Sequence, residues 1–382
     1  MFDFDHAPDR RGTGSYKWDS YPEGVIPMWV ADMDFRTAPA IVEALRNRVD
    51  HGVFGYTLVG DDYDDAVTRW FAHRHGWTID PAMIIYTSGV VPAVSAIIKA
   101  MTRPGDKVVL QTPAYNCFFS SIRNNGCEAS RNELLRQADG SYRIDFDDLE
   151  ARCADPAAKL LILCNPHNPT GRIWSAEELK RIAGICAANG VFVISDEIHC
   201  ELTYNGREYT PFGTLAPEGL RYAVCVSPSK AFNTAGLQIA NIVASDADVR
   251  AKIDRAINDN EVCDVNPFGV AGTIAAYGHG EAWLDELRGY LWQNWLTVRD
   301  FFAKELPAYG LTPLESTYLV WIDCRHTGIG SDRLSAMLIE GGVALSPGSI
   351  YGDAGYMRLN IACPRARLEE GLCRIAAVLG KL

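Results

Sequence analysis

Lys230 and Asp196 are the two residues whose types and positions most directly suggest chemistry. Lys230 lies in the run SPSKAFN (227–233) and Asp196 in the run VISDEIH (193–199), each where a strand-like apolar segment ends. A lysine amine can form a Schiff base with an aldehyde, and neighbouring serine hydroxyls can bind a phosphate. A carboxylate that ends a hydrophobic strand needs a cationic partner, because burial of an unpaired charge is costly. That partner is either a protonated ring nitrogen or a structural salt bridge, and the alternative for Lys230 is an ordinary surface lysine.

The loop NPHNPTG (165–171) is a third polar motif, and it directly follows the apolar run Leu160–Cys164. Its two prolines stiffen the backbone. The loop would therefore present two asparagine amides and an imidazole at the carboxyl end of a strand, where α/β sheets bind ligands. A rigid turn whose amides bond only to local backbone is the structural alternative. The whole seven-residue run NPHNPTG at a strand end nevertheless favours a ligand site.

The fourth motif, SGVVP (88–92), lies between a strand-like and a helix-like segment. Pro92 suits the first turn of a helix, and Gly89 lets a ligand approach the backbone. The free N–H groups at such a helix start could hold a phosphate. Taken alone, the motif more often marks an ordinary strand-to-helix turn, so it gains weight only beside the other three.

Short apolar runs that alternate with longer helix-period segments must position these motifs. The runs have strand length, and most are flanked by turn residues; they are Met83–Thr87, Val108–Gln111, Leu160–Cys164, Val191–Ser195, Ala223–Ser227 and Ile239–Ala244. This alternation predicts an α/β fold with a mainly parallel sheet sandwiched by helices. The motifs lie at strand ends, as expected for a ligand cleft.

The C-terminal part changes to a smaller α+β pattern. Its segments are Glu281–Glu305, Tyr318–Asp323, Ser331–Glu340, Met357–Ile361 and Arg365–Leu379. With 382 residues, 48% of them hydrophobic, the chain is longer than a domain with a single hydrophobic core usually is. We therefore expect a large domain (46–276), a small C-terminal domain (277–382), and an N-terminal segment (1–45) that is an arm and part of the small domain. The first 36 residues lack periodicity, so we expect them to lie on another part of the molecule without forming a packed element.

Composition argues against several classes of protein. The net charge is −12 and no run of Lys or Arg occurs, so nucleic acid and membrane surfaces are not expected as partners. The eleven cysteines are scattered without a C-x-x-C pair, which indicates neither a disulfide framework nor a metal site and fits a reducing cytoplasm. The N-terminus has no secretory pattern, and no apolar window approaches about eighteen residues. We expect a cytoplasmic protein that does not span a membrane.

Together, the four motifs resemble those of the fold-type I pyridoxal 5'-phosphate (PLP) enzymes, the aspartate aminotransferase superfamily. The resemblance is strongest to the cystathionine β-lyase branch, the MalY/PatB C–S lyases, and covers essentially the whole chain. Further matching segments are SYKWD (15–19), VADMDF (30–35), GVFGY (52–56) and QTPAY (111–115). The resemblance implies the aminotransferase class I fold and PLP as cofactor.

The resemblance also implies a role for each motif residue. Lys230 would form the Schiff base, and Asp196 would bind the protonated ring nitrogen, which makes the ring an electron sink. Asn168 and His199 would lie near the phenolic oxygen of the ring. The cofactor phosphate would be held by Gly89, Val90, Val91, Ser227 and Ser229.

Two tyrosines belong to the implied catalytic set beside Lys230. Tyr115 would stack on the cofactor ring, and core packing beside Phe118 and Phe119 is the alternative. Tyr56 would cross to the phosphate of a neighbouring subunit. The resemblance therefore implies a homodimer with shared active sites.

Arg358, with Asn168 and Ala31, would bind the substrate, because a guanidinium group matches both oxygens of an α-carboxylate. An ordinary surface charge is the alternative for Arg358. The chain departs from many aminotransferases at Gln238, where an arginine commonly neutralises the phosphate, and the lyase branch shares this departure. Ala231 stands where that branch often has a hydroxyl residue, which could alter cofactor affinity.

The resemblance favours a PLP-dependent C–S β-lyase that cleaves L-cystathionine or other cysteine S-conjugates, small amino-acid substrates, to a thiol, pyruvate and ammonia. The freed amine of Lys230 would act as the general base. A class I/II aminotransferase acting on an amino acid and a 2-keto acid is the first alternative. A regulator that keeps the fold and binds a transcription factor is the second, although intact Lys230, Asp196 and Arg358 argue against a pure binding module.

Overall fold

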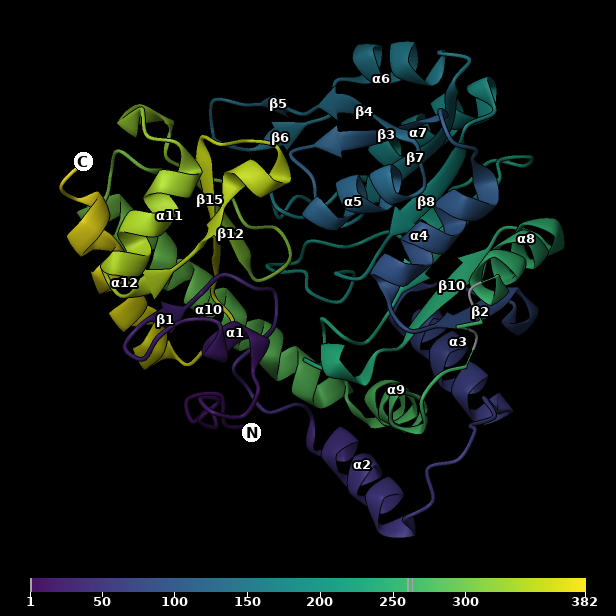
Figure 1. Ribbon diagram of the computed structural model, residues 1–382, viewed down its shortest axis with the longest axis horizontal. Helices are drawn as coiled ribbons and strands as arrows, with labels where there is room; N and C mark the ends of the chain where they lie inside the picture. The colour runs from purple at the N-terminus through teal and green to yellow at the C-terminus, as the bar shows by residue number, and fades with distance from the viewer. Residues whose placement is uncertain (1, 260, 263) are drawn as a thin grey trace.

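Two sheets covered by helices organise the chain, as the computed structural model of residues 2–259, 261–262 and 264–382 shows (Figure 1). A seven-stranded sheet lies on one side of the view and a four-stranded sheet on the other. None of the helices in these described ranges is both long enough and apolar enough to cross a membrane.

The large sheet has the strand order β2-β10-β9-β8-β7-β3-β4. Its strands are β2 (Ile84–Thr87), β3 (Lys107–Thr112), β4 (Glu128–Glu133), β7 (Ala158–Cys164), β8 (Phe192–Asp196), β9 (Tyr222–Val226) and β10 (Ala240–Ala244). The pairs from β4 to β9 are parallel, and β10 runs antiparallel to both β9 and β2. The predicted fold class is therefore confirmed. Strand β4 was not predicted, because its sequence EASRNE is polar and exposed at the sheet edge.

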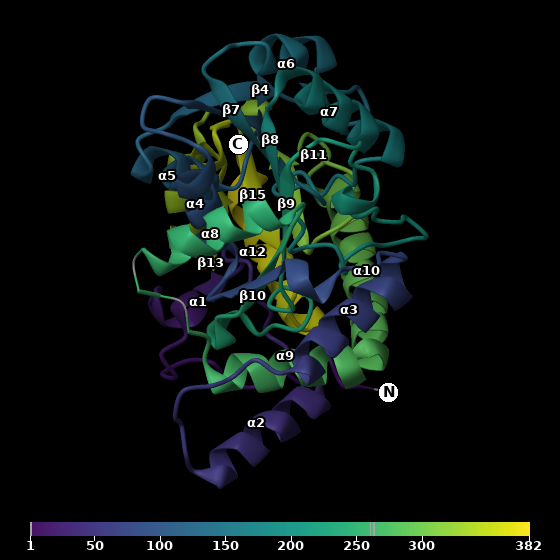
Figure 2. The same ribbon diagram turned by 90° about the vertical axis from the view of Figure 1, so that its right-hand side faces the viewer.

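The large sheet separates two hydrophobic cores, because successive side chains of a strand point to opposite faces. In β7, Leu161 and Leu163 enter one core while Leu160 and Ile162 enter the other. Helices α4 (Val90–Met101), α5 (Asn116–Asn124) and α8 (Ala247–Asn258) cover the second face. The first face is covered by α3 (Asp61–His75), α6 (Phe146–Cys153), α7 (Ala176–Asn189) and α9 (Pro267–His279), and α2 (Pro39–His51) packs on α9 (Figure 2).

The small sheet is antiparallel and has the order β11-β12-β15-β14. Its strands are β11 (Gly310–Leu311), β12 (Leu319–Asp323), β14 (Ser346–Pro347) and β15 (Tyr356–Asn360), and the helices of this part are α10 (Glu281–Glu305), α11 (Ser331–Glu340) and α12 (Arg365–Leu379). All three helices have the predicted bounds. The shorter elements are α1 (Tyr16–Asp19), β1 (Ile26–Pro27), β5 (Leu135–Arg136), β6 (Tyr142–Arg143), β13 (Val343–Ala344) and the 3₁₀ turns Pro81–Met83, Phe212–Thr214, Ala235–Leu237, Arg325–Thr327 and Gly348–Tyr351.

Residues 2–36 lie on the C-terminal part of the chain (Figure 1), but the prediction that this segment forms no packed element is wrong. Strand β1 pairs in parallel with β13, and Met33 and Phe35 are buried. Asn233 fixes the segment to the loop after β9, because its side chain accepts from Met33 N–H and donates to the carbonyls of Met33 and Phe35. These partners are about 200 positions apart in sequence, so no local pattern predicts the packing.

A buried charge cluster around Asp34 completes this attachment. Both Asp34 and Lys17 are 1% exposed and lie 3.1 Å apart. Arg10 and Arg367 contact the same carboxylate at 3.1 and 2.9 Å, and Trp18 Nε1 donates to it at 2.9 Å. Burial alone would raise the pKa of Asp34, but Lys17, the Trp18 hydrogen bond and Arg367 outweigh it and lower the pKa.

We predict that Asp34→Asn lowers the free energy of unfolding by about 3–5 kcal/mol, because Lys17, Arg10 and Arg367 lose their shared buried carboxylate and Lys17 keeps only the more exposed Asp32, at 3.6 Å. The measurement is urea unfolding at pH 7. Because the pKa of Asp34 is lowered in the folded state, this contribution is present at neutral pH and is lost as the pH falls below about 4. Asp65→Asn, which removes an exposed ion pair with Arg69, is the control and should change stability little. Equal effects of the two substitutions would contradict the prediction.

Candidate active site

A cavity of about 330 Å³ opens where β7, β8 and β9 end. Cys164 and Asp196 are the last residues of β7 and β8, and they are neighbours in the register of the sheet. The loop after β9 adds Ser229 and Lys230. The wall also includes Ala31, Ser88, Gly89, Val90, Val91, Pro92, Tyr115, Asn168, Ile198, His199, Ala235, Gln238 and Ile239. The carboxyl ends of parallel strands thus form the cavity, at the place where this fold class generally binds ligands.

Lys230 extends into this cavity and donates from Nζ to the carbonyl oxygen of Ala31 at 2.7 Å. The hydroxyl of Tyr318 donates to the same oxygen at 3.1 Å. Burial and the nearby positive charge of Arg358 lower the pKa of Lys230 to about 8. A useful fraction of the amine is therefore uncharged near neutral pH, which is the form that attacks a carbonyl or accepts a proton.

Asp196 is 4% exposed and faces the cavity from the end of β8. Its Oδ1 accepts from the backbone N–H of Ile198 at 3.1 Å. Burial raises the pKa of Asp196 to about 7, and that hydrogen bond and the charge of Lys230 offset the shift only in part. Of the cationic side chains described, none lies within ion-pair distance of this carboxylate. The structural salt bridge considered above is therefore not formed.

Two nitrogen atoms beside the cavity lack hydrogen-bond partners within the described chain. They are Nδ1 of His199, which is 2% exposed, and Nε of Arg358, which is 3% exposed. Burial and the charges of Lys230 and Arg358 lower the pKa of His199 to about 3, so the ring is neutral. Buried polar atoms without partners mark places where a ligand completes the hydrogen bonding. An aldehyde cofactor with a protonated ring nitrogen and a phenolic oxygen fits this set, because it offers a cation to Asp196 and polar atoms to the histidine side.

The start of α4 forms a second end of the cavity and suits a phosphate. Its first helical hydrogen bond joins the N–H of Ala93 to the carbonyl of Gly89. The amides of Val90 and Val91 therefore have no acceptor within the helix and can bind an anion. Ser229 and Gln238 line the same cavity. Ser227 does not line it; its hydroxyl donates to Ile239 O at 2.7 Å and accepts from the amide of Ser229.

Within the loop 165–171, the polar side chains divide between structure and site. Asn165 donates to Glu197 and to the carbonyl of Thr210, and His167 pairs with Thr170, so these groups follow the structural alternative. Asn168 instead lines the cavity.

Arg358 comes from β15 of the small sheet and reaches the edge of the cavity. Its Nη1 donates to Oδ1 of Asn168 at 3.1 Å, and its Nη2 donates to the carbonyl of Trp29 at 2.9 Å. Its guanidinium carbon lies 4.7 Å from the ring centroid of Tyr351. Arg358 is therefore not the surface charge considered above, and it approaches the other substrate-binding candidates, Asn168 and Ala31, from the opposite part of the fold.

The two tyrosines of the predicted set occupy different places. Tyr115 lines the cavity and also packs edge-on against Phe118, with ring centroids 5.6 Å apart, so the core-packing alternative is present and stacking on a cofactor stays a prediction. Tyr56 is 99% exposed and lies outside the cavity of its own chain. Tyr318, Cys164 and Ile198 adjoin the site but were not predicted; for Tyr318, the only signal was its place at the start of a predicted strand.

We predict that cofactor-free protein captures added PLP covalently at a rate that rises with pH and has its midpoint near 8, because only the uncharged amine of Lys230 attacks the aldehyde. Stopped-flow absorbance would measure the rate. In Arg358→Gln the midpoint should move upward, because a positive neighbour is lost. A wild-type midpoint near 10.4, the value of an exposed lysine, would contradict the prediction.

Comparisons with known proteins agree with this geometry. Residues 23–375 match the family Aminotransferase class I and II. The chain is 44% identical to cystathionine beta-lyase PatB of Bacillus subtilis, with 98% of this chain and 99% of PatB covered, and 36% identical to the protein MalY of Escherichia coli, with 97% of each covered.

Two similar solved structures have PLP in their descriptions. Cystalysin from Treponema denticola superposes with a TM-score of 0.96 at 34% identity, with 100% of this chain and 99% of that one covered. The PLP-bound C-S lyase from Staphylococcus hominis superposes with a TM-score of 0.93 at 34% identity, with 99% of each chain covered. These matches confirm the predicted fold and resemblance: the chain belongs to the class I and II aminotransferase family.

Proposed function

We propose that this protein is a PLP-dependent C–S β-lyase that cleaves L-cystathionine or related cysteine S-conjugates to a thiol, pyruvate and ammonia. The observation that carries the proposal is the meeting of Lys230, Asp196 and Arg358 around one cavity, in a chain whose near-full-length relatives include a cystathionine beta-lyase and a C-S lyase.

The cofactor is pyridoxal 5'-phosphate, whose ring, once bound, accepts the electron pair left at the substrate Cα. Lys230 would hold its aldehyde carbon and Asp196 its ring nitrogen. The amides of Val90 and Val91, with Gly89 and Ser229, would hold its phosphate. Ser227 would act through Ser229, because its hydroxyl accepts from the Ser229 amide. Tyr115 would cover one face of the ring, and Asn168 and His199 would lie near its phenolic oxygen.

The contacts described support a role for individual residues in each step of the proposed reaction. Arg358 and Asn168 orient the substrate carboxylate. The two side chains are already hydrogen-bonded to each other, so both can contact the same carboxylate when the substrate binds. The amine of Lys230, with its lowered pKa, removes the proton from the substrate Cα. The carbonyl of Ala31 then accepts a hydrogen bond from the resulting ammonium, as it does from Nζ now.

The alternative of a dicarboxylate-specific aminotransferase needs a second cation near the distal end of the substrate. Among the described residues that line the cavity, Lys230 is the only cationic side chain. Arg358 at its edge can therefore serve one carboxylate. The apolar wall around Ile198, Ile239 and Val90 suits the thioether segment of L-cystathionine, whose distal carboxylate carries its own ammonium and does not require a second protein cation.

We also propose a cytoplasmic homodimer with shared active sites and the division into segments 1–45, 46–276 and 277–382. An exposed apolar stretch with Val53, Phe54 and Leu58 surrounds Tyr56, and burial of these side chains against a second subunit would bring Tyr56 towards the other active site.

The pairing of β1 with β13 supports the placement of the N-terminal arm with the C-terminal domain. The described cysteines are free thiols, which is compatible with a reducing compartment.

We predict that L-cystathionine gives equal amounts of pyruvate and thiol without an added 2-keto acid, because the thiolate leaves from Cβ. Coupled assays for the two products on the PLP-loaded enzyme would measure this, with Lys230→Ala as the inactive control. Turnover that requires a 2-keto acid acceptor would show an aminotransferase instead.

Shared active sites predict complementation between two inactive variants. Tyr56→Ala and Lys230→Ala should each lose activity alone, whereas their mixed dimer contains one site with both wild-type residues and regains activity. The assay is β-elimination by co-expressed, tandem-purified mixed dimers. If Tyr56 serves the site of its own chain, the mixed dimer has no complete site and stays inactive.

A further inference from the structure

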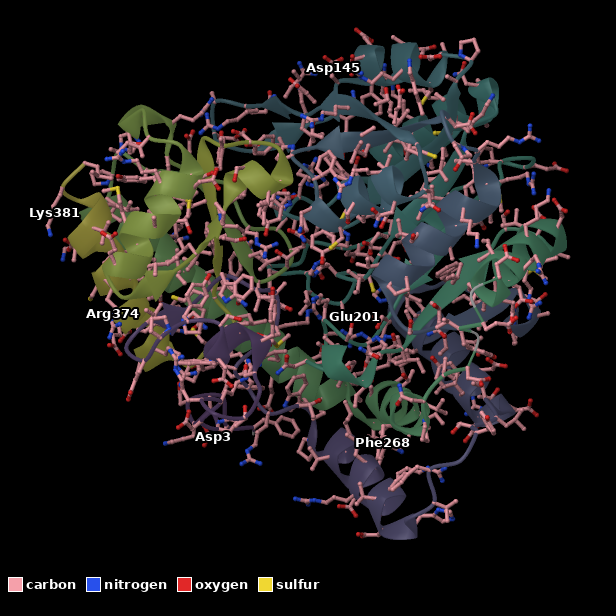
Figure 3. The ribbon with its side chains drawn as sticks, viewed as in Figure 1. Asp3, Asp145, Glu201, Phe268, Arg374 and Lys381 are labelled. Atoms are coloured by element: carbon pink, nitrogen blue, oxygen red, sulfur yellow. The ribbon has the colours of Figure 1, made fainter. Side chains whose placement is uncertain are left out.

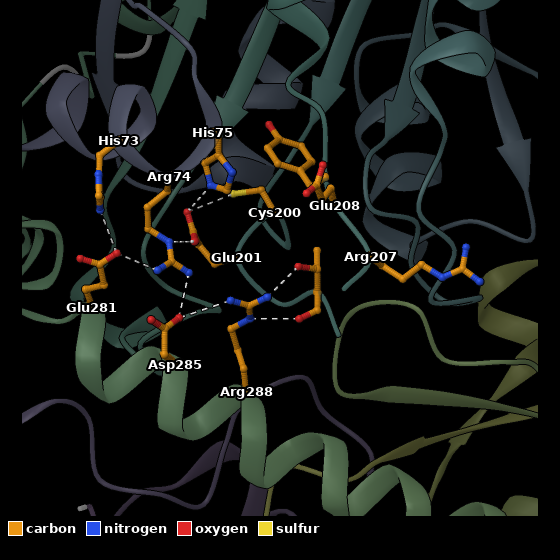
Figure 4. Close-up of a pocket in the computed structure, with 12 residues that line it drawn as sticks. His73, Arg74, His75, Cys200, Glu201, Arg207, Glu208, Glu281, Asp285 and Arg288 are labelled. Atoms are coloured by element: carbon orange, nitrogen blue, oxygen red, sulfur yellow. Dashed lines mark hydrogen bonds and ion pairs between the residues drawn. The ribbon is translucent and has the colours of Figure 1, made fainter. Parts of the chain in front are cut away.

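A second cavity, of about 530 Å³, lies beside the loop that continues from the cofactor-binding strand β8. It is lined by the end of α3, the start of α10 and residues that directly follow His199 (Figure 4). Its charged residues are the carboxylates Glu201, Glu208, Glu281 and Asp285 and the guanidinium groups of Arg74, Arg207 and Arg288. The four carboxylates outnumber the three guanidinium groups by one, so the charge of these groups leaves room for a bound cation.

Three potential metal ligands converge on one wall of this cavity. A ring nitrogen of His75, Sγ of Cys200 and a carboxylate oxygen of Glu201 all lie within 4.8 Å of one another. Oε1 of Glu201 is 2.7 Å from His75 Nε2 and 4.0 Å from Cys200 Sγ. Ligand atoms around a tetrahedral zinc ion stand about 3.3–3.7 Å apart, since each lies about 2.0–2.3 Å from the metal. Small rotations of these side chains therefore suffice to surround an ion.

We propose that His75, Cys200 and Glu201 bind one zinc ion, with a water molecule from the cavity in the fourth position. One imidazole nitrogen, one thiolate and one carboxylate oxygen form a mixed donor set that suits zinc better than the oxygen-preferring Mg²⁺ or Ca²⁺. Nothing in the proposed lyase chemistry uses this cluster, so the proposal adds a site to the proposed function and does not depend on it.

Outer contacts already hold the carboxylate of Glu201 in position. Trp70 Nε1 donates to its Oε1 at 2.6 Å, and Arg74 Nε donates to its Oε2 at 3.1 Å. Metal-binding carboxylates are commonly oriented by such second hydrogen bonds. Glu201 is only 5% exposed and lies towards the centre of the molecule, whereas Asp145 and Lys381 lie at its periphery (Figure 3). The cavity gives an ion its path to this buried position.

The metal-free alternative is a simple ion pair between His75 and Glu201, with Cys200 as a buried thiol. Metal binding would require the Cys200 thiol to release its proton as the ion binds. The two interpretations differ in one observable: only the metal site makes the Cys200 sulfur a thiolate ligand.

Zinc binding would also stabilise the loop that carries Asp196 and His199. Cys200 and Glu201 follow Asp196 and His199 in one loop, and the N–H of Cys200 donates to the carbonyl of Glu197 at 3.0 Å. An ion that ties this loop to the end of α3 stabilises the folded protein by mass action. The melting temperature should therefore rise with zinc concentration.

The test is a zinc titration of the chelator-treated, PLP-loaded enzyme against a chromophoric chelator, followed by Co²⁺ substitution. We expect one zinc per chain with a Kd below about 1 μM, and a thiolate-to-cobalt charge-transfer band. Cys200→Ser should remove the band and weaken binding at least about 100-fold. The matched controls are His73→Gln, two residues before His75 on the same helix and exposed, and the exposed Cys373→Ser; both should bind as the wild type does.

Absence of stoichiometric binding to the wild type would overturn the proposal, as would a cobalt complex without a thiolate band. Equal weakening in His73→Gln and Cys200→Ser would also overturn it, because the ion would then be held by the cavity's surface charges. Visible PLP absorbance and circular dichroism verify that each variant is folded. Loss of lyase activity on cystathionine would refute the proposed function but would leave the zinc result standing.

Discussion

The carboxylate of Asp196 is buried without a cationic ion-pair partner among the described residues, and this constraint explains the arrangement of the site around it. Burial alone would make such a group a neutral acid, as the raised pKa indicates. A ligand that carries a protonated ring nitrogen supplies the missing charge and keeps the proton on the ring. In the proposed function, the unpaired Asp196 carboxylate would contribute to binding of the cofactor, because the protonated ring nitrogen supplies the missing cation.

Three distant parts of the chain must meet to use that carboxylate. The large sheet supplies Asp196 and Lys230 from adjacent strand ends, the small sheet supplies Arg358, and the N-terminal arm supplies the Ala31 carbonyl that accepts from Lys230. The arm keeps its place through Asn233 and the buried charges around Asp34. The packing of the arm and the geometry of the site are thus coupled, because displacement of the arm would also remove the hydrogen-bond acceptor of the Lys230 amine.

Much of this arrangement could be predicted from the sequence because its signals are local. Apolar runs gave six of the seven large-sheet strands, and helix periodicity gave the bounds of α10, α11 and α12. Motifs at strand ends placed Lys230, Asp196 and Asn168 at one cavity. The edge strand β4 gave no signal because its sequence is mostly polar and exposed, whereas the packed arm and the Tyr318 contact depend on residues distant in sequence. The cluster of His75 with Cys200 and Glu201 escaped the cysteine analysis because His75 lies 126 positions before Glu201.

The protonation state of Asp196 with and without cofactor is the most direct test of this account. Infrared difference spectroscopy at pH 6, with Asp196→Asn to assign the band, can follow the carboxylic acid of this one residue. The account predicts a protonated-acid band in the cofactor-free protein that disappears when PLP binds, because the ring nitrogen then holds the proton and the carboxylate is ionised. An Asp196 carboxylate that is already ionised at pH 6 without PLP, or an acid band that persists after PLP binds, would contradict it.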